Sequence, residues 1–192
     1  MGKIIAKLIL KLFGWRTQNQ KPAEIKKFVA MMAPHTSNWD FVIGWLGYKS
    51  LGFSSKYLIK KEAFFFPMGG LLKSLGAIPV DRKASNSIVV QVGEQFLKRN
   101  EFILTVTPEG TRSLNKNWKR GYYYIAEHAK VPIVLCFLDY KKKLGGIGSV
   151  FYPTGNYEAD LKEIEKFYEN INAKYPEKFN LSIVNRDKNL NP

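Results

Sequence analysis

The chain has 192 residues, of which 45% are apolar, and this size and composition fit a single domain with its own buried core. Its 30 lysines and arginines against 16 acidic residues give a net charge of +14. Partners are therefore expected among polyanions such as nucleic acid, an anionic lipid surface or phosphate-bearing substrates. Lysine greatly outnumbers arginine and no RNA- or DNA-binding motif is visible, which disfavours nucleic acid. No apolar run is long enough to span a membrane and no secretory signal is visible, so we expect a protein that stays in the cytoplasm.

The first predicted element is an amphipathic helix within residues 1–16. Lysines recur every four residues along one stripe, at Lys3, Lys7 and Lys11. Apolar side chains cover much of the remaining surface: Ile4, Ile5, Leu8, Ile9, Leu12 and Phe13. Trp15 suits the boundary between lipid headgroups and acyl chains. The pattern predicts a helix lying in the membrane interface, and the alternative is a helix packed on the core of the protein.

Strands and helices alternate along the rest of the chain. Strands are predicted at 28–32, 57–59, 77–80, 102–107, 133–138 and 149–152. Helices are predicted between and after them at 38–48, 64–75, 87–98, 118–130 and 158–175. Such alternation buries strands on both faces, which agrees with the continuous apolar runs at 102–106 and 133–138. The sequence therefore predicts an α/β fold, with a mostly parallel central sheet flanked by helices over 17–184 and a frayed tail over 185–192.

The segment 33–40 follows the first predicted buried strand and opens the next helix. His35 and Asp40 are five residues apart, which in one continuous helix would turn them roughly 140° from each other, so His35 must precede the helix. Ser37 is then a natural N-cap, and Asp40 three residues later can reach back to the imidazole. Such a pair would let His35 act as a general base towards a hydroxyl group. The alternative is that Asp40 only caps the helix and that His35 is an ordinary loop histidine.

Two further segments place arginine after a strand. In 107–113, Pro108 and Gly110 predict a type I turn whose backbone amides, together with Arg112, would cradle a phosphate. The alternative is a strand-ending turn with a solvated arginine. Segment 76–82 supplies Arg82, which could equally be a surface arginine paired with its neighbouring aspartate. No metal-ligand cluster is visible, and Cys136 is interpreted as a buried core residue.

These segments, together with 131–134, occur in the order of the motif blocks of the glycerolipid acyltransferase family, and the chain resembles that family over roughly residues 28–140. The family includes the 1-acylglycerol-3-phosphate and glycerol-3-phosphate acyltransferases. The resemblance implies that His35 is the base and Asp40 its partner. It also implies an acceptor-binding site made of Arg82, Glu109, Gly110, Thr111 and Arg112. One departure is Thr107, which stands where the family usually has an aromatic or apolar residue.

The resemblance also implies a reaction. A fatty acyl group would pass from a thioester, acyl-CoA or acyl-carrier protein, to the hydroxyl of a lysophospholipid or glycerol phosphate, with the thioester as co-substrate and no bound cofactor. The acyl chain would lie along the apolar residues of 64–72, which could equally belong to the core. The protein would be peripheral, on the cytoplasmic face of an anionic membrane, with no nucleic-acid partner. Two alternatives stay open: an acceptor such as a monoacylated amino-acid lipid, and a non-catalytic basic module that binds membranes or nucleic acid.

Overall fold

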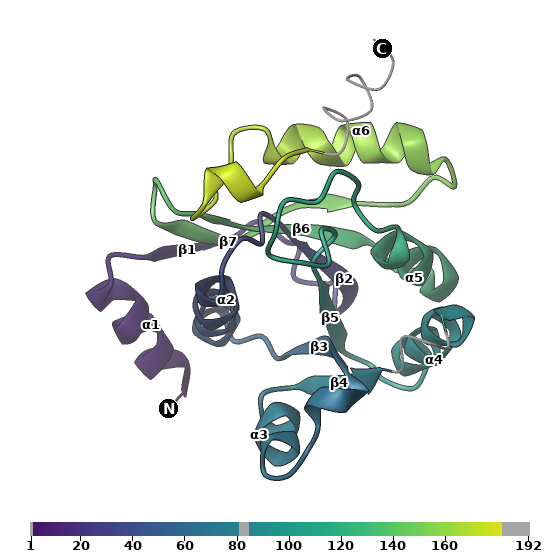
Figure 1. Ribbon diagram of the computed structural model, residues 1–192, viewed down its shortest axis with the longest axis horizontal. Helices are drawn as coiled ribbons and strands as arrows, with labels where there is room; N and C mark the ends of the chain where they lie inside the picture. The colour runs from purple at the N-terminus through teal and green to yellow at the C-terminus, as the bar shows by residue number, and fades with distance from the viewer. Residues whose placement is uncertain (1, 81–84, 182–192) are drawn as a thin grey trace.

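The computed structural model describes residues 2–80 and 85–181. Within them a seven-stranded sheet runs through the centre of the molecule in the order β1-β7-β6-β2-β5-β3-β4 (Figure 1). All neighbouring strands in it are parallel except β6 and β7. The predicted α/β fold with a mostly parallel sheet is confirmed. The strands are β1 (Arg16–Asn19), β2 (Lys27–Met32), β3 (Ser55–Lys60), β4 (Ala77–Val80), β5 (Phe102–Val106), β6 (Ile133–Asp139) and β7 (Leu144–Phe151).

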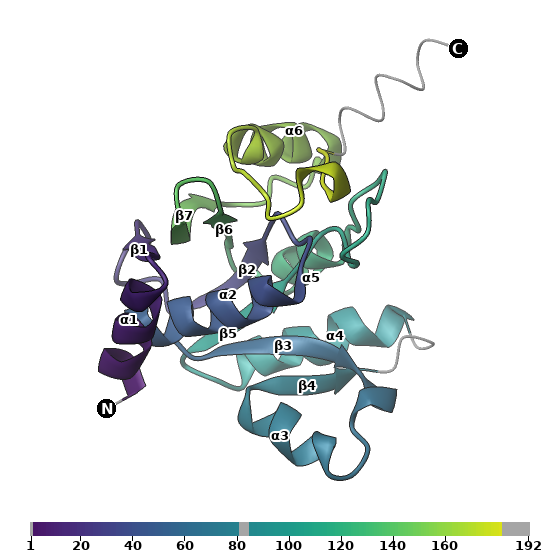
Figure 2. The ribbon, with the colours of Figure 1, turned by 60° about the vertical axis from the view of Figure 1, so that its left-hand side comes forward.

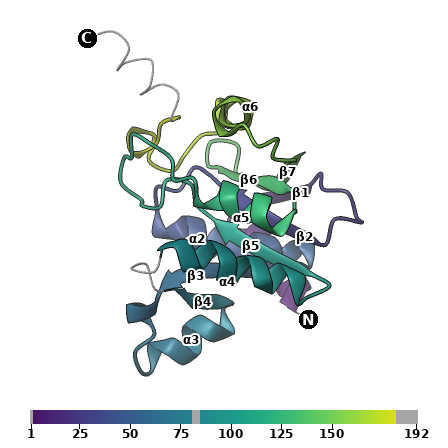
Figure 3. The ribbon, with the colours of Figure 1, turned by 90° about the vertical axis from the view of Figure 1, so that its right-hand side faces the viewer.

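Helices cover both faces of the sheet. Figures 1 and 3 show α2 on one face and α4 and α5 on the other, and α1 lies against α2. The helices are α1 (Gly2–Leu12), α2 (Asn38–Leu51), α3 (Met68–Ser74), α4 (Ser85–Leu97), α5 (Gly121–Ala129) and α6 (Tyr157–Tyr168). Alternate residues of β2 enter the two cores: Val29 and Met31 pack with α4, α5 and α6, whereas Phe28, Ala30 and Met32 pack with α1 and α2. This alternation explains why β2 is apolar along its whole length.

The main differences from the prediction concern β1, β7 and α6, and the other elements differ by a few residues at their ends. Strand β1 was not predicted, because its sequence Arg-Thr-Gln-Asn is polar and it lies at the edge of the sheet, where it is only partly buried. The last strand begins at Leu144 and not at residue 149, since glycines at its start conceal the apolar pattern. Helix α6 ends at Tyr168 and not at residue 175, because the chain then turns back and the Asn172 carbonyl accepts a hydrogen bond from the backbone N–H of Tyr140 at 2.9 Å.

Helix α1 lies alongside α2, as Figure 2 also shows. It buries only Ala6 and Leu10, and both the lysine stripe and most of its apolar side chains remain exposed, with Leu8 61% and Leu12 82% exposed. Trp15 corrects one expectation: it is buried at the end of this segment and is not free to lie at a lipid boundary. No helix among the described residues has the length and apolarity needed to cross a bilayer. The tail predicted over 185–192 lies outside the described residues.

The position of β2 in the sheet determines where the functional loops meet. It lies between β5 and β6 and is parallel to both. The loops that follow these three strands therefore open at the same edge, the carboxyl edge, where open α/β sheets bind their ligands. His35 follows β2, Glu109 follows β5 and Tyr140 follows β6.

Candidate active site

The loop between β2 and α2 is held by a capping box. Ser37 is the N-cap of α2, and its hydroxyl oxygen accepts a hydrogen bond from the Trp39 N–H at 3.1 Å. The carboxylate of Asp40 in the first turn accepts the backbone N–H groups of Thr36 at 2.7 Å and Ser37 at 2.8 Å, both through Oδ2. These bonds satisfy donors that the helix itself leaves free. They also fix a carboxylate that is only 3% exposed.

The same oxygen contacts the imidazole of His35. His35 Nδ1 lies 3.2 Å from Asp40 Oδ2, and 17% of the His35 side chain is exposed. Burial alone would raise the pKa of Asp40, but hydrogen bonds from His35, Tyr140 and Ser37 outweigh it and hold the pKa below its usual value. Asp40 is thus a carboxylate, which only accepts hydrogen bonds, so Nδ1 of a neutral His35 carries the proton. Nε2 is then unprotonated and able to accept a proton.

Tyr140 completes the surroundings of the carboxylate. Its hydroxyl donates to Asp40 Oδ1 at 2.6 Å, so both carboxylate oxygens are engaged. Burial and the neighbouring Asp40 charge raise the pKa of Tyr140 well above its ordinary value, which keeps the hydroxyl protonated as a donor. The sequence analysis did not single out Tyr140. It could have been found from its place after a buried strand, because the ends of neighbouring parallel strands meet at one edge.

Glu109 holds the backbone of His35 in place. Its Oε1 accepts the His35 backbone N–H at 2.8 Å, and its side chain is buried beside the pair formed by His35 and Asp40. Its other oxygen, Oε2, has no hydrogen-bond partner among the described residues. Burial raises the pKa of Glu109 to about 7. The carboxyl group therefore touches the backbone of the His35 loop, whereas the family resemblance implied a contact with the acceptor.

The turn after Glu109 carries exposed polar and basic groups. Gly110 has a φ of 64°, and Thr111 and Arg112 beyond it are exposed. A Cβ at Gly110 would lie 2.8 Å from carbon atoms of the Lys119 side chain, so this lysine lies over the turn. Lys119 is a cation that the sequence analysis did not include in the site. The remaining predicted arginine, Arg82, lies outside the described residues.

Two other side chains with reactive groups, Cys136 and His128, take no part in these contacts. Cys136 is buried in β6, and burial raises the pKa of its thiol to about 12, as suits a core residue. His128 is exposed on α5, where it packs against Gly93 of α4. Of the two histidines in the chain, only His35 therefore contacts a carboxylate in the described residues.

Comparison with known proteins identifies the family. A family model described as Acyltransferase matches residues 15–138, which include His35, Asp40 and the turn at Gly110. The chain belongs to the acyltransferase family. This acyltransferase-family chain is 34% identical over 131 residues to a 1-acyl-sn-glycerol-3-phosphate acyltransferase of Bacillus subtilis, an alignment that covers 67% of the chain and 64% of that protein. It is 31% identical over 107 residues to the human 1-acyl-sn-glycerol-3-phosphate acyltransferase beta, covering 48% of the chain and 38% of that protein.

A solved structure supports the fold of this acyltransferase-family chain. The crystal structure of the 1-acyl-sn-glycerophosphate (LPA) acyltransferase PlsC from Thermotoga maritima superposes with a TM-score of 0.59 at 16% identity. The match covers 97% of this chain and 78% of the Thermotoga chain. The similarity at this identity concerns the fold. The chain spans 64% of the length of the Bacillus relative and about two fifths of that of a Saccharomyces cerevisiae relative, of which it covers 43%.

Proposed function

We propose that this protein is an O-acyltransferase that moves a fatty acyl group from a thioester to the hydroxyl of a lysophospholipid or glycerol phosphate. The observation that carries the proposal is the contact of 3.2 Å between His35 Nδ1 and Asp40 Oδ2, which leaves Nε2 of a partly exposed imidazole as a base. The names of the Bacillus and human relatives support lysophosphatidic acid as the acceptor.

The reaction follows from the state of the two side chains. His35 Nε2 takes the proton of the acceptor hydroxyl as its oxygen attacks the thioester carbonyl. Asp40 remains ionised and stabilises the imidazolium that forms. The tetrahedral adduct then breaks its C–S bond, the ester remains with the acceptor, and the imidazolium returns its proton to the thiolate of the leaving carrier. Each turnover therefore returns His35 to its starting state and releases one free thiol.

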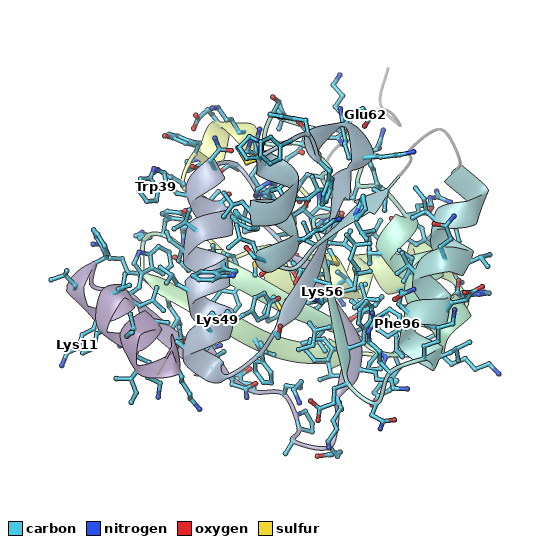
Figure 4. All side chains as sticks on the ribbon, turned by 90° about the horizontal axis from the view of Figure 1, so that it is seen from below. Lys11, Trp39, Lys49, Lys56, Glu62 and Phe96 are labelled. Carbon is cyan, nitrogen blue, oxygen red and sulfur yellow. The ribbon has the colours of Figure 1, made fainter. Side chains whose placement is uncertain are left out.

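Exposed apolar side chains support a membrane as the place of reaction. They lie on α1 and just after it, at the N-terminal end of α2, in the segment that leads into α3, and on α3 itself. We refer to them as the apolar face: Ile4, Ile5, Leu8, Leu12, Phe13, Trp39, Val42, Phe65, Phe66, Met68 and Leu71. Figure 4 shows α1 beside α2 from below, with Lys11 and Trp39 projecting outward. Exposed apolar groups interspersed with lysines are typical of surfaces that bind anionic lipid.

The apolar face reaches the candidate site. Trp39 is 55% exposed and immediately precedes Asp40, so the candidate site adjoins an exposed apolar side chain. Phe66, which the sequence analysis considered for the acyl chain, is 96% exposed and is not core. An acceptor whose acyl chain stays in the bilayer would present its hydroxyl to His35 from this side, with Arg112 and Lys119 available to its phosphate. We propose that the protein binds an anionic membrane peripherally.

The test is acyl transfer by the purified protein. Lysophosphatidic acid, glycerol 3-phosphate and a monoacylated amino-acid lipid are each offered with acyl-CoA or with acyl-carrier protein, and released thiol and ester product are measured. We expect ester formation with a phosphate-bearing acceptor and its loss in His35→Ala. The matched control is His128→Ala, which removes the other histidine and should retain activity.

Two outcomes would contradict the proposal. Ester formation only with the amino-acid lipid would move the acceptor to a carboxylate-bearing lipid. Absence of thiol release with every pair of substrates, or full activity in a folded His35→Ala variant, would indicate a non-catalytic module or a different base.

A further inference from the structure

Tyr140 lies at the site but belongs to none of the motif blocks that the sequence displays. Its hydroxyl donates to Asp40 Oδ1 at 2.6 Å, while Oδ2 of the same carboxylate serves His35 and two backbone amides. We propose that Tyr140 is a positioning residue that fixes the plane of the Asp40 carboxylate and thereby the orientation of His35. The proposal rests on the proposed role of His35 as the base.

The argument for a fixed plane comes from the distribution of donors. Three donors converge on Oδ2, and they leave the carboxylate of Asp40 able to swing about that oxygen. The Tyr140 bond on Oδ1 is the second point of attachment, and two points define the orientation of a planar group. Because His35 has its Nδ1 contact with Oδ2 at 3.2 Å, which is long for a bond to a carboxylate, a small rotation would break it.

The ring of Tyr140 is itself held from two sides. The ring of Trp15, which follows α1, meets it edge-on with centroids 5.0 Å apart and planes at 90°. On the other side, the Lys174 ammonium lies 5.9 Å from the centroid of the Tyr140 ring. The backbone N–H of Tyr140 donates to the Asn172 carbonyl at 2.9 Å. These neighbours restrict the orientation of the Tyr140 ring, so its hydroxyl stays directed at Asp40 Oδ1.

Residues 172–175, which we call the strap, join Tyr140 to the His35 loop. The Lys174 ammonium also lies 5.4 Å from the ring of Trp39 and 5.6 Å from that of Tyr175. The Tyr175 backbone N–H donates to the Thr36 hydroxyl at 3.2 Å. The strap therefore contacts the loop after β2 and the end of β6 together. This arrangement keeps Tyr140 and Asp40 together although Tyr140 follows β6 and Asp40 lies in the first turn of α2.

Kinetics test the role in catalysis. Tyr140→Phe removes only the hydroxyl and keeps the ring contacts, and Tyr152→Phe, at an exposed tyrosine just beyond β7, is the matched control. We expect kcat to fall about tenfold in Tyr140→Phe, as for loss of one hydrogen bond to a charged group, with both KM values within twofold. The same lost bond should lower the melting temperature by a few degrees without preventing folding. In an Asp40→Asn background the same change should have no further effect. An unchanged kcat, or the same loss in the Asp40→Asn background, would overturn the proposal.

A second measurement needs no substrate. The chain has two histidines, so spectra of protein with ¹⁵N-labelled histidine are assigned with His35→Ala alone. The Nδ1 proton of His35 should give a resolved resonance in the wild type and in Tyr152→Phe, and should broaden or disappear in Tyr140→Phe. If no acyl transfer occurs with any substrate, the proposed function fails, but this spectrum still tests the geometry. A His35 resonance identical in all three proteins overturns the positioning role.

Discussion

Replacing Asp40 by Asn removes one charge and preserves the shape of the side chain. The amide oxygen of Asn can accept the three hydrogen bonds that Oδ2 now receives, from Thr36 N–H, Ser37 N–H and His35. The Tyr140 hydroxyl can turn and accept from the new NH₂ group. Since no buried donor loses its partner, the variant is expected to fold with a loss of less than about 1 kcal/mol.

Activity should respond very differently. A neutral amide cannot stabilise the imidazolium that forms when His35 takes a proton, so the benefit of Asp40 to general-base catalysis is lost. We expect kcat to fall by about 10²–10⁴, which corresponds to roughly 3–5 kcal/mol in the activation barrier. The assay is thiol release at saturating acceptor, with a thermal melt of the same preparation. Near-normal turnover by folded Asp40→Asn would refute the assigned mechanism.

Asp40→Ala separates the structural role from the catalytic one. It leaves the buried donors of Thr36, Ser37 and Tyr140 without an acceptor, each at a cost of about 1–3 kcal/mol. A loss of at least about 3 kcal/mol lowers the melting temperature of a chain of this size by about 6 °C or more. Because the pKa of folded Asp40 is lowered, the part of this stabilisation that depends on its charge is complete at neutral pH and is lost as the pH falls through the pKa of the folded state. The difference in stability between wild type and Asp40→Ala should therefore shrink in acid.

Two further perturbations test the buried acid and the apolar face. Burial raises the pKa of Glu109 to about 7, so the folded state binds this proton more tightly than the unfolded state. The free energy of unfolding of the wild type should therefore fall by up to about 3 kcal/mol as the pH rises from 4.5 through 7. Thermal melts of Glu109→Gln should not show this loss. Changing both Leu8 and Leu12 to Glu should abolish sedimentation with anionic vesicles without altering the melting temperature. The control Leu97→Glu, at a similarly exposed leucine of α4, should still sediment with the vesicles. Equal binding by both variants would exclude α1 as the membrane contact.

The buried central strands were predictable from the sequence, whereas the edge strand β1 and the end of α6 were not. The apolar runs of β5 and β6 identify strands buried on both faces, since such strands have little choice of residue. Strand β1 is polar because an edge strand needs only backbone hydrogen bonds, and these leave no mark on the sequence. The end of α6 depends on the bond between Asn172 and Tyr140, which joins distant parts of the chain.

In the candidate site, likewise, contacts between residues close in sequence were predictable and contacts between distant residues were not. The approach of Asp40 to His35 follows from a capping box, in which all partners lie within a few residues, so the spacing in the sequence is sufficient to predict it. Tyr140 is 100 residues from Asp40, and their contact depends on β6 lying beside β2. The burial of Trp15 likewise depends on the position of Tyr140, so an amphipathic pattern alone assigned it to the wrong environment.

The pairing of β1 with β7 has a consequence for biosynthesis. Arg16 lies opposite Leu144, so the earliest of the described strands to be synthesised pairs with the latest of them. At usual rates of translation the intervening chain takes roughly 6 to 25 seconds to synthesise. During this interval Leu10 and Trp15, which the finished fold buries in one cluster with Leu138 and Ile147, lack these later partners, which makes the nascent chain a client for a chaperone or a lipid surface. A chain that stops before residue 144 would never complete this edge, and its amino-terminal segment would remain unpaired.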